Sequence, residues 1–286
     1  MNAHFETWRQ KTSSSLKALD AGCHPKEVIA TIAEDLLGHY VGKPLIDAYD
    51  VYQHLMNYWA ETMQDDCYLI AADGWRAETT RIIVLDKKGK AKDKGWTCEF
   101  IPKPLIVAHF LAEEQAAIDE LGAELETVTA RLSEMEEEHG GEDGAFAALD
   151  KVNMARATAR LKEIEGEKES KEDATVLTEW LKLNGVVTDL KTRLRQAEAA
   201  LDAQAYDMYP KMSDGEVKSL VVDDKWLAAL DAAVHGEMER VSNALTQRLK
   251  ALAERYEAPL PEMVHRVSEL EGRVNRQLER MGFAWN

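Results

Sequence analysis

The fold of this chain is decided by residues 105–138, which read LIVAHFLAEEQAAIDELGAELETVTARLSEMEEE. This stretch has no proline, and Gly122 is its single glycine. Its apolar residues alternate spacings of three and four, which is the pattern of the buried stripe of a coiled coil. The stripe comprises Ile118, Leu121, Leu125, Val128, Leu132 and Met135. We therefore expect a long helix that buries one face against another helix.

A second stripe of the same kind lies in residues 178–209 and ends before Pro210. Its members are Val187, Leu190, Leu194, Ala197 and Leu201. A connection that begins at His139-Gly140-Gly141 separates the two stretches. Each would be about 50 Å long at a helical rise of about 1.5 Å per residue. We expect an antiparallel coiled-coil arm, with a shorter insert at residues 149–161 near its tip.

The charge of the chain is concentrated in this arm. The formal net charge is −17, and residues 103–209 carry 24 Asp and Glu against 12 Lys and Arg. Such a balance excludes a general nucleic-acid or membrane coat, which needs excess basic residues. Between Leu111 and Asp143 there are 12 acidic residues and one basic residue. These charges form either a solvated face or, by hypothesis, a surface that keeps nucleic acid away from the arm.

The flanking regions are predicted to be mostly helical. In residues 1–102, helices are expected before Gly22, from Pro25 to about Leu37, and from Pro44 to about Asp66. The period then changes to that of strands, which we expect at 68–70, 81–85 and 96–101, with a polar turn at 87–95. Residues 210–286 predict two helices, at 226–256 and 263–281, which either form a hairpin or join the arm.

The sequence thus predicts a mainly α fold in three regions. Residues 1–102 form a helical region with a small antiparallel β-hairpin, residues 103–209 the coiled-coil arm, and residues 210–286 a C-terminal helical hairpin. No apolar signal core or membrane-spanning run occurs. Three separated cysteines without a CxxC motif fit a reducing compartment, so a cytoplasmic location is expected.

One dense basic cluster stands at the predicted hairpin tip. It consists of Lys87, Lys88, Lys90, Lys92 and Lys94. The cluster has two interpretations. Charged residues on a hairpin discourage edge-to-edge pairing of sheets. The same lysines could instead contact DNA phosphates, which would position DNA without reading its sequence.

Motifs of catalysis and metal binding are missing from the sequence. It has no GxGxxG, GxxxxGK[ST], HExxH or GxSxG pattern and no metal-type Cys/His spacing. The pair Asp65-Asp66 is interpreted as structural or capping rather than as metal ligands, and Cys23-His24 as a loop before a helix rather than a nucleophile and base. The remaining aromatic candidates are Trp75, Trp96, Trp180 and Trp226. All four are interpreted as core residues, and stacking on nucleic-acid bases is an alternative for Trp75 and Trp96.

Several long stretches resemble one known family. Residues 44–66 read PLIDAYDVYQHLMNYWAETMQDD and residues 71–75 read AADGW. Residues 136–142 read EEEHGGE, residues 218–227 KSLVVDDKWL and residues 252–256 LAERY. These stretches are similar to the C-terminal part of the modification (M) subunit of type I restriction-modification systems, and the resemblance spans nearly the whole chain.

The resemblance implies a function in DNA modification. Members of the family are adenine-N6 DNA methyltransferases that use S-adenosylmethionine and work with a specificity (S) subunit and a restriction (R) subunit. Their catalytic domain carries an Asn/Asp-Pro-Pro-Tyr/Phe motif that grips the flipped adenine. This sequence has no Pro-Pro pair. We therefore expect the chain to lack the catalytic core, to be no enzyme by itself, and to bind no cofactor, so that no catalytic, cofactor or metal residue is assigned.

What the resemblance leaves is the part of the family that joins M to S. We expect a non-catalytic assembly module that binds the S subunit, and through the complex the R subunit and DNA, with self-association as a further expectation. The residues expected to pack against partner helices are Leu121, Leu125, Val128, Leu132, Leu190, Leu194, Leu201, Leu245, Leu249 and Leu252. The alternatives are one half of a split methyltransferase acting in trans, a competitor of the intact M subunit, and an unrelated helical scaffold.

Overall fold

The structure of the chain is a computed structural model. It describes residues 2–85, 87, 89–141, 144–147, 149, 151–164, 170–257 and 260–283. The chain divides into two compact units. Unit 1 contains residues 1–15, 23–68 and 226–286, and unit 2 contains residues 16–22 and 69–225. The boundaries of these units differ from the three regions expected from the sequence, because α3 (Ala48–Tyr58) packs on the distant helix α10 (Ala228–Arg255).

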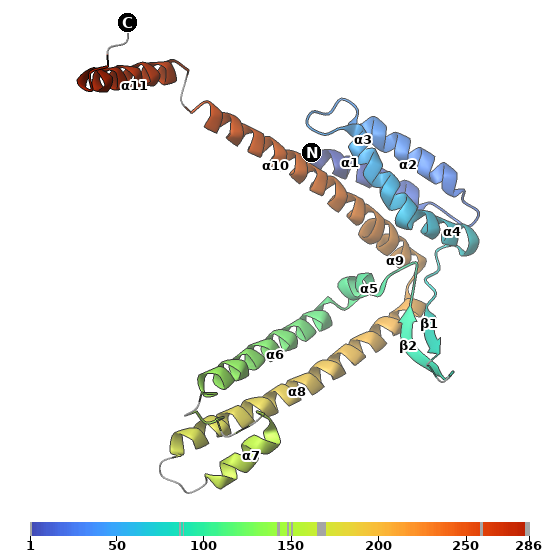
Figure 1. Cartoon of the computed structure of the whole chain (residues 1–286). Coiled ribbons are helices and arrows are strands. Elements are labelled where there is room, and N and C mark those ends of the chain that lie inside the picture. Colours follow the sequence, from blue (N-terminus) through green and yellow to red (C-terminus); the bar gives the residue numbers. More distant parts are fainter. Residues whose placement is uncertain are drawn as a thin grey trace. The chain divides into compact units, whose positions relative to one another are not determined.

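Unit 2 is built on an antiparallel helical arm (Figure 1). In it, α5 (Lys103–Phe110) and α6 (Ala112–Glu138) pack along α8 (Lys171–Met208). Two polar contacts fix the direction of the pair. Lys103 at the start of α5 forms an ion pair with Asp202 near the end of α8. At the other end, the Trp180 indole donates a 2.9 Å hydrogen bond to Glu136. The coiled-coil arm predicted from the two stripes is confirmed.

The tip of the arm has a hydrophobic core of its own. Here α7 (Met154–Glu163) packs on α8, and Asn153 caps its first turn by accepting a hydrogen bond from the Arg156 amide. The rings of Phe146 and Trp180 meet edge to face with centroids 5.9 Å apart. The core consists of Leu132, Met135, Ala145, Phe146, Ala157, Ile164, Leu177, Trp180 and Val187. The insert expected near residues 149–161 is therefore a packed helix.

The β-structure of unit 2 is a single hairpin among the described residues. Strands β1 (Thr80–Leu85) and β2 (Ala91–Thr97) pair antiparallel. The prediction of a β-hairpin is confirmed, but two details of the expected strands are wrong. Residues 68–70 belong to helix α4 (Gln64–Asp73), where they continue the preceding helix. The second strand begins at Ala91, inside the stretch expected to be a polar turn.

After the arm, unit 2 closes with short helical turns. These are the 3₁₀ turn η2 (Tyr209–Lys211), α9 (Asp214–Ser219) and the π-helix η3 (Leu220–Leu227), whose last two residues belong to unit 1. Ser213 and Glu216 form a reciprocal capping box at the start of α9. The Tyr209 hydroxyl donates a 2.7 Å hydrogen bond to the Ile101 carbonyl, which ties η2 to the chain before α5.

Unit 1 is a helical assembly around α3. It contains most of α1 (Asn2–Lys17), then α2 (Pro25–Tyr40), α3 (Ala48–Tyr58), the π-helix η1 (Trp59–Met63) and α10 (Ala228–Arg255). Helix α3 packs on both α2 and α10. Pro25 stands in the first turn of α2, and Asp47 caps α3 by accepting a 2.8 Å hydrogen bond from the Tyr49 amide. The buried residues include Phe5, Trp8, Leu36, Val51, Leu55, Met63 and Leu230.

The last helix of unit 1 is α11 (Leu260–Arg280), and it contains no buried residue. Both helices expected after Pro210 are thus present, while their pairing as a hairpin stays a prediction. The mainly α fold class with a small antiparallel sheet is confirmed. Within the described ranges, every helix is too short or too polar to cross a membrane.

Candidate interaction surfaces

The predicted lysine cluster lies on the β-hairpin. Lys87, Lys90, Lys92 and Lys94 are all exposed, and Lys88 lies outside the described residues. The hairpin register pairs Val84 with Lys92. Arg81 adds a further cation to the hairpin, and it forms a 3.1 Å ion pair with Asp93. The structure therefore brings four of the five predicted lysines together on one exposed ribbon.

The base of the hairpin is fixed to α8 by Trp96. Its ring lies 5.5 Å from the Tyr206 ring and 5.2 Å from the Tyr209 ring, measured between centroids. Its Nε1 donates a 3.1 Å hydrogen bond to Asp202, the carboxylate that also pairs with Lys103. Partial burial tends to raise the pKa of Asp202, but the hydrogen bonds from Lys103 and Trp96 outweigh it and lower that pKa. Trp96 is thus a packing residue, and its contacts with Tyr206 and Tyr209 cover part of the ring surface that a base would need for stacking.

The leucines predicted to contact a partner helix fall into two groups. Those of α6 and α8 line the arm, where Leu132, Leu190 and Leu201 are buried. Leu121, Leu125, Val128 and Leu194 are half-buried in the same arm. Packing between α6 and α8 thus already covers much of the surface of these leucines. Their contact with a partner helix stays a prediction.

The second group lies on α10 and is open to solvent. Leu245 is 47% exposed and Leu249 is 59% exposed, while Leu252 is half-buried. The apolar residues of α11 share this character, and their spacing predicted the helix, but they were not assigned to a partner surface from the sequence. The exposed apolar residues of α11 are Leu260, Met263, Val264, Val267, Leu270 and Val274. We call Leu245, Leu249 and these six residues the C-terminal apolar face.

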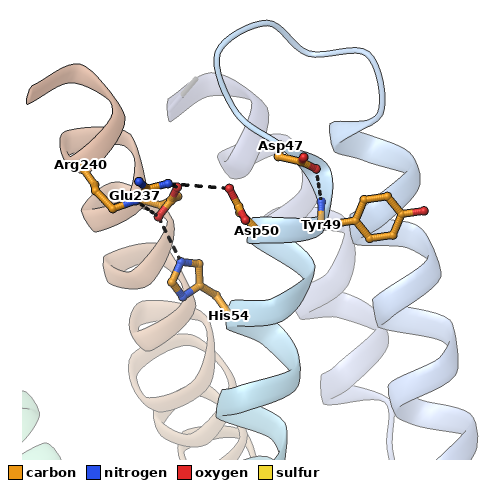
Figure 2. Close-up of polar contacts among 6 residues, drawn as sticks. All are labelled: Asp47, Tyr49, Asp50, His54, Glu237 and Arg240. Carbon is orange, nitrogen blue, oxygen red and sulfur yellow. Dashed lines mark hydrogen bonds and ion pairs between the residues drawn. The ribbon is translucent and has the colours of Figure 1, made fainter. Parts of the chain in front are cut away.

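The half of α10 nearer its start is held to α3 by a charged network (Figure 2). Glu237 is 8% exposed and accepts hydrogen bonds from Arg240, with Nε at 2.9 Å. His54 Nε2 lies 3.7 Å from Glu237 Oε2, and Arg240 reaches Asp50 at 3.8 Å. The hydrogen bond from Arg240 lowers the pKa of Glu237 despite its burial, and His54 contributes in the same direction. Two side chains of α3 thus bind two of α10.

The pair Asp65-Asp66 has a structural role, in agreement with the sequence interpretation. Asp65 is exposed, whereas Asp66 is 3% exposed and accepts a 2.7 Å hydrogen bond from Trp226 Nε1. Burial and the Asp66 charge together raise the pKa of Tyr58. Within the described part of the chain, no three His, Cys, Asp or Glu side chains gather closely enough to hold a metal ion.

The other residues singled out in the sequence occupy structural positions. His24 is exposed, and the half-buried Cys23 directs its sulfur to the Cys67 carbonyl oxygen at 3.9 Å. Trp75 is buried against Phe100, and its Nε1 donates a 2.7 Å hydrogen bond to the Leu19 carbonyl. Trp180 belongs to the core of the arm tip.

An open hollow of about 580 Å³ lies where α5, α6 and α8 meet. Its lining includes the apolar Val107, Ile118 and Leu201 and the charged Lys103 and Glu198. Hollows of this size can accept a small molecule. Lys103 is paired with Asp202 inside the chain.

Comparison of the chain with protein-family models, with curated proteins and with solved structures found no match. The family resemblance in the sequence therefore stays a prediction. The two candidate surfaces are the exposed lysine hairpin of unit 2 and the C-terminal apolar face of unit 1.

Proposed function

We propose that this chain is a non-catalytic assembly module of a type I restriction-modification methyltransferase, and that the C-terminal apolar face binds helices of the specificity subunit. The observation that carries the proposal is the exposure of that face. Val264 is 60% exposed, Val267 54% and Val274 55%, although all three lie on one side of a regular helix. Apolar side chains gathered on one exposed side of a helix mark sites of protein interaction.

The spacing of the face indicates a helical partner. Leu260, Val264, Val267 and Val274 of the face follow a heptad, which Leu278 and Met281 continue and which Glu271 interrupts between 267 and 274. Side chains at such positions insert between those of a second helix. Amphipathic helices bind in this way to grooves and to other helices.

The charged network at Glu237 supports the same proposal. Because Glu237 and Arg240 join α10 to Asp50 and His54 of α3, the start of α10 is fixed within unit 1. Leu245 and Leu249 follow one and two turns later and leave their side chains in solvent. A helix anchored at one end presents its other end to a partner at a lower cost in conformational entropy.

The resemblance to the M subunit supplies the identity of the partner. In that family the S subunit separates its recognition domains with long helices, against which helices of M pack. On this proposal methyl transfer with S-adenosylmethionine belongs to a catalytic domain outside this sequence. The R subunit and DNA would be reached through the assembled complex.

The proposal is tested by co-purification of the full chain with the specificity subunit of its own system. The double variant Val267→Glu/Val274→Glu places charge on the apolar face and should reduce binding at least tenfold. Its charge-matched control is Arg273→Gln/Arg276→Gln, which changes the net charge by the same −2 by removing two positive charges from the other side of α11. Wild-type binding that survives the first variant, or is lost equally in both, would refute the proposal.

A further inference from the structure

The β1–β2 hairpin differs in charge from the rest of the chain. Residues 80–97 contain six Lys and Arg against two Asp, a net of +4. The remainder of the chain contains 29 Lys and Arg against 50 Asp and Glu, a net of −21. A polyanion is therefore attracted to the hairpin and repelled by the other surfaces.

The hairpin is also exposed along its length. Every residue of β1 is exposed, and β2 is exposed from Ala91 to Lys94. Among the described residues, this sheet has two strands and no third strand beside them. Only the end at Trp96 is packed, against Tyr206 and Tyr209. The ribbon is thus held at its base and open at its tip.

The register places aliphatic and cationic side chains on the same face. Val84 pairs with Lys92, and paired residues of antiparallel strands share a face. The register shifts between Arg81 and Ile83, where β2 contains one extra residue beside Gly95. Gly95 has a φ of 108°, a backbone conformation that residues with a side chain rarely adopt. The bulge places Lys94 on the same face as Lys92, opposite Ile82. The face therefore combines Ile82 and Val84 with two lysines.

The acidic residue of β2 does not cancel this charge. Asp93 lies on the opposite face, where it pairs with Ile83 in the register and forms its ion pair with Arg81. Its Oδ1 also accepts a 2.9 Å hydrogen bond from the Gly95 amide, which holds the bulge. The lysine face is left with its positive charge.

The two-stranded form and the positive charge of the hairpin fit duplex DNA in the B form. Its major groove is about 12 Å wide and admits a two-stranded β-ribbon. The major groove of A-form RNA is too narrow and deep for side chains to enter. An interfacial membrane segment separates an apolar face from a charged one, whereas here Lys92 pairs with Val84 on one face and Asp93 with Ile83 on the other. The combination favours DNA over a lipid surface.

We propose that the β1–β2 hairpin inserts into the major groove of B-form DNA, with Lys87, Lys90, Lys92 and Lys94 neutralising phosphates while Ile82 and Val84 contact base edges. This contact is separate from the C-terminal apolar face and goes beyond the proposed assembly function. The four lysines would add affinity without sequence preference, because phosphate contacts carry no base information.

The test is fluorescence anisotropy of a fluorescein-labelled duplex of about 20 base pairs with the full chain, across a NaCl series. Four phosphate contacts predict a log–log salt slope of about −3.6. Between about 50 and 200 mM NaCl, affinity should then fall on the order of 100-fold. The variant Lys87→Gln/Lys90→Gln/Lys92→Gln/Lys94→Gln should lose at least tenfold in affinity and most of the salt slope.

The matched control, Lys171→Gln/Lys182→Gln/Lys191→Gln/Lys250→Gln, removes the same charge from helices α8 and α10. It should bind DNA within about threefold of the wild type, because these lysines are not part of the hairpin. A second variant, Val84→Thr, keeps every charge and should weaken binding by a smaller factor. Circular dichroism confirms that each variant is folded.

Four outcomes would overturn the inference. In the first, the wild type does not bind DNA at about 50 mM NaCl, where phosphate contacts are strongest. In the second and third, the hairpin variant binds DNA as tightly as the wild type, or both quadruple variants lose affinity equally. In the fourth, the lysines mediate binding to phosphatidylserine vesicles and not to DNA. Because the hairpin variant should still bind the specificity subunit, its result is independent of the proposed assembly function.

Discussion

Trp226 Nε1 donates a 2.7 Å hydrogen bond to Asp66 Oδ2, and both side chains are buried. The bond joins residues 160 positions apart in the sequence. Trp226 stands in the π-helix η3, and π-helices are often retained for a functional or structural reason. Here the π-helix carries the indole that satisfies a buried carboxylate.

The first prediction concerns this bond. Trp226→Phe keeps most of the apolar surface but removes the N–H donor, so Asp66 loses a partner while still buried. Leaving a buried hydrogen-bonding group unsatisfied costs about 1–3 kcal/mol or, for a charged group, more. Chemical denaturation should show a loss of free energy of unfolding in that range. The matched variant Trp226→Phe/Asp66→Asn removes the charge as well and should recover part of the loss; no recovery would contradict this account.

A second prediction follows from Glu237. Its pKa is lowered in the folded chain, chiefly by the hydrogen bond from Arg240. Its stabilising contribution is therefore complete above the ordinary glutamate pKa of about 4.3 and is lost as pH falls through the lower folded value. Glu237→Gln should cost about 1 kcal/mol near neutral pH, because Arg240 is exposed and can be rehydrated.

The measurement is the free energy of unfolding of wild type and Glu237→Gln across pH 3 to pH 7. The two curves should converge on the acid side, where Glu237 becomes neutral in both states. The exposed Glu239, two residues further along α10, serves as the control, and Glu239→Gln should shift stability by less than about 0.5 kcal/mol. A constant difference at every pH would show that the charge of Glu237 has no part in the effect.

A third prediction concerns the cysteines. Burial, chiefly, raises the pKa of Cys67 to about 12. The thiolate is the reactive form, so Cys67 should resist alkylation in the folded chain. The buried Cys98 should behave likewise for lack of access, while the half-buried Cys23 reacts first. Timed iodoacetamide labelling with peptide mass spectrometry at pH 8 measures the order, and early modification of Cys67 would disagree with its burial.

A fourth prediction concerns the tip of the arm. Trp180 is 2% exposed and contacts Phe146 while its indole donates to Glu136. Trp180→Ala should cost about 3–5 kcal/mol in the stability of this core. Hydrogen exchange should rise in α7 and at the end of α6, and it should remain unchanged in the helices of unit 1. Uniform loss of protection across the chain would show instead that the tip does not unfold as a unit.

Much of the fold could be predicted from spacing alone. The stripes of α6 and α8 indicated the arm because their partner is nearby in sequence and of similar length. The strand expected at residues 68–70 was wrong because a run of three apolar residues fits a buried helix as well as a strand. The packing of α3 on α10 could not be predicted, because it depends on contacts such as His54 with Glu237, which no local pattern encodes.

The candidate surfaces were only partly predictable for a related reason. An apolar stripe shows that a helix face will be buried, but not by what. Leu132 and Leu190 are buried by each other's helices, whereas Leu249 carries the same signal and remains 59% exposed. Only the three-dimensional arrangement separates the stripe used for folding from the stripe left for a partner.

The most direct test of the assembly function is hydrogen–deuterium exchange of the full chain with and without the specificity subunit. The account predicts a stable complex in which amide protection increases in residues 241–281, while the α6–α8 arm changes little. Protection confined to the arm, or no complex with a folded specificity subunit, would contradict it.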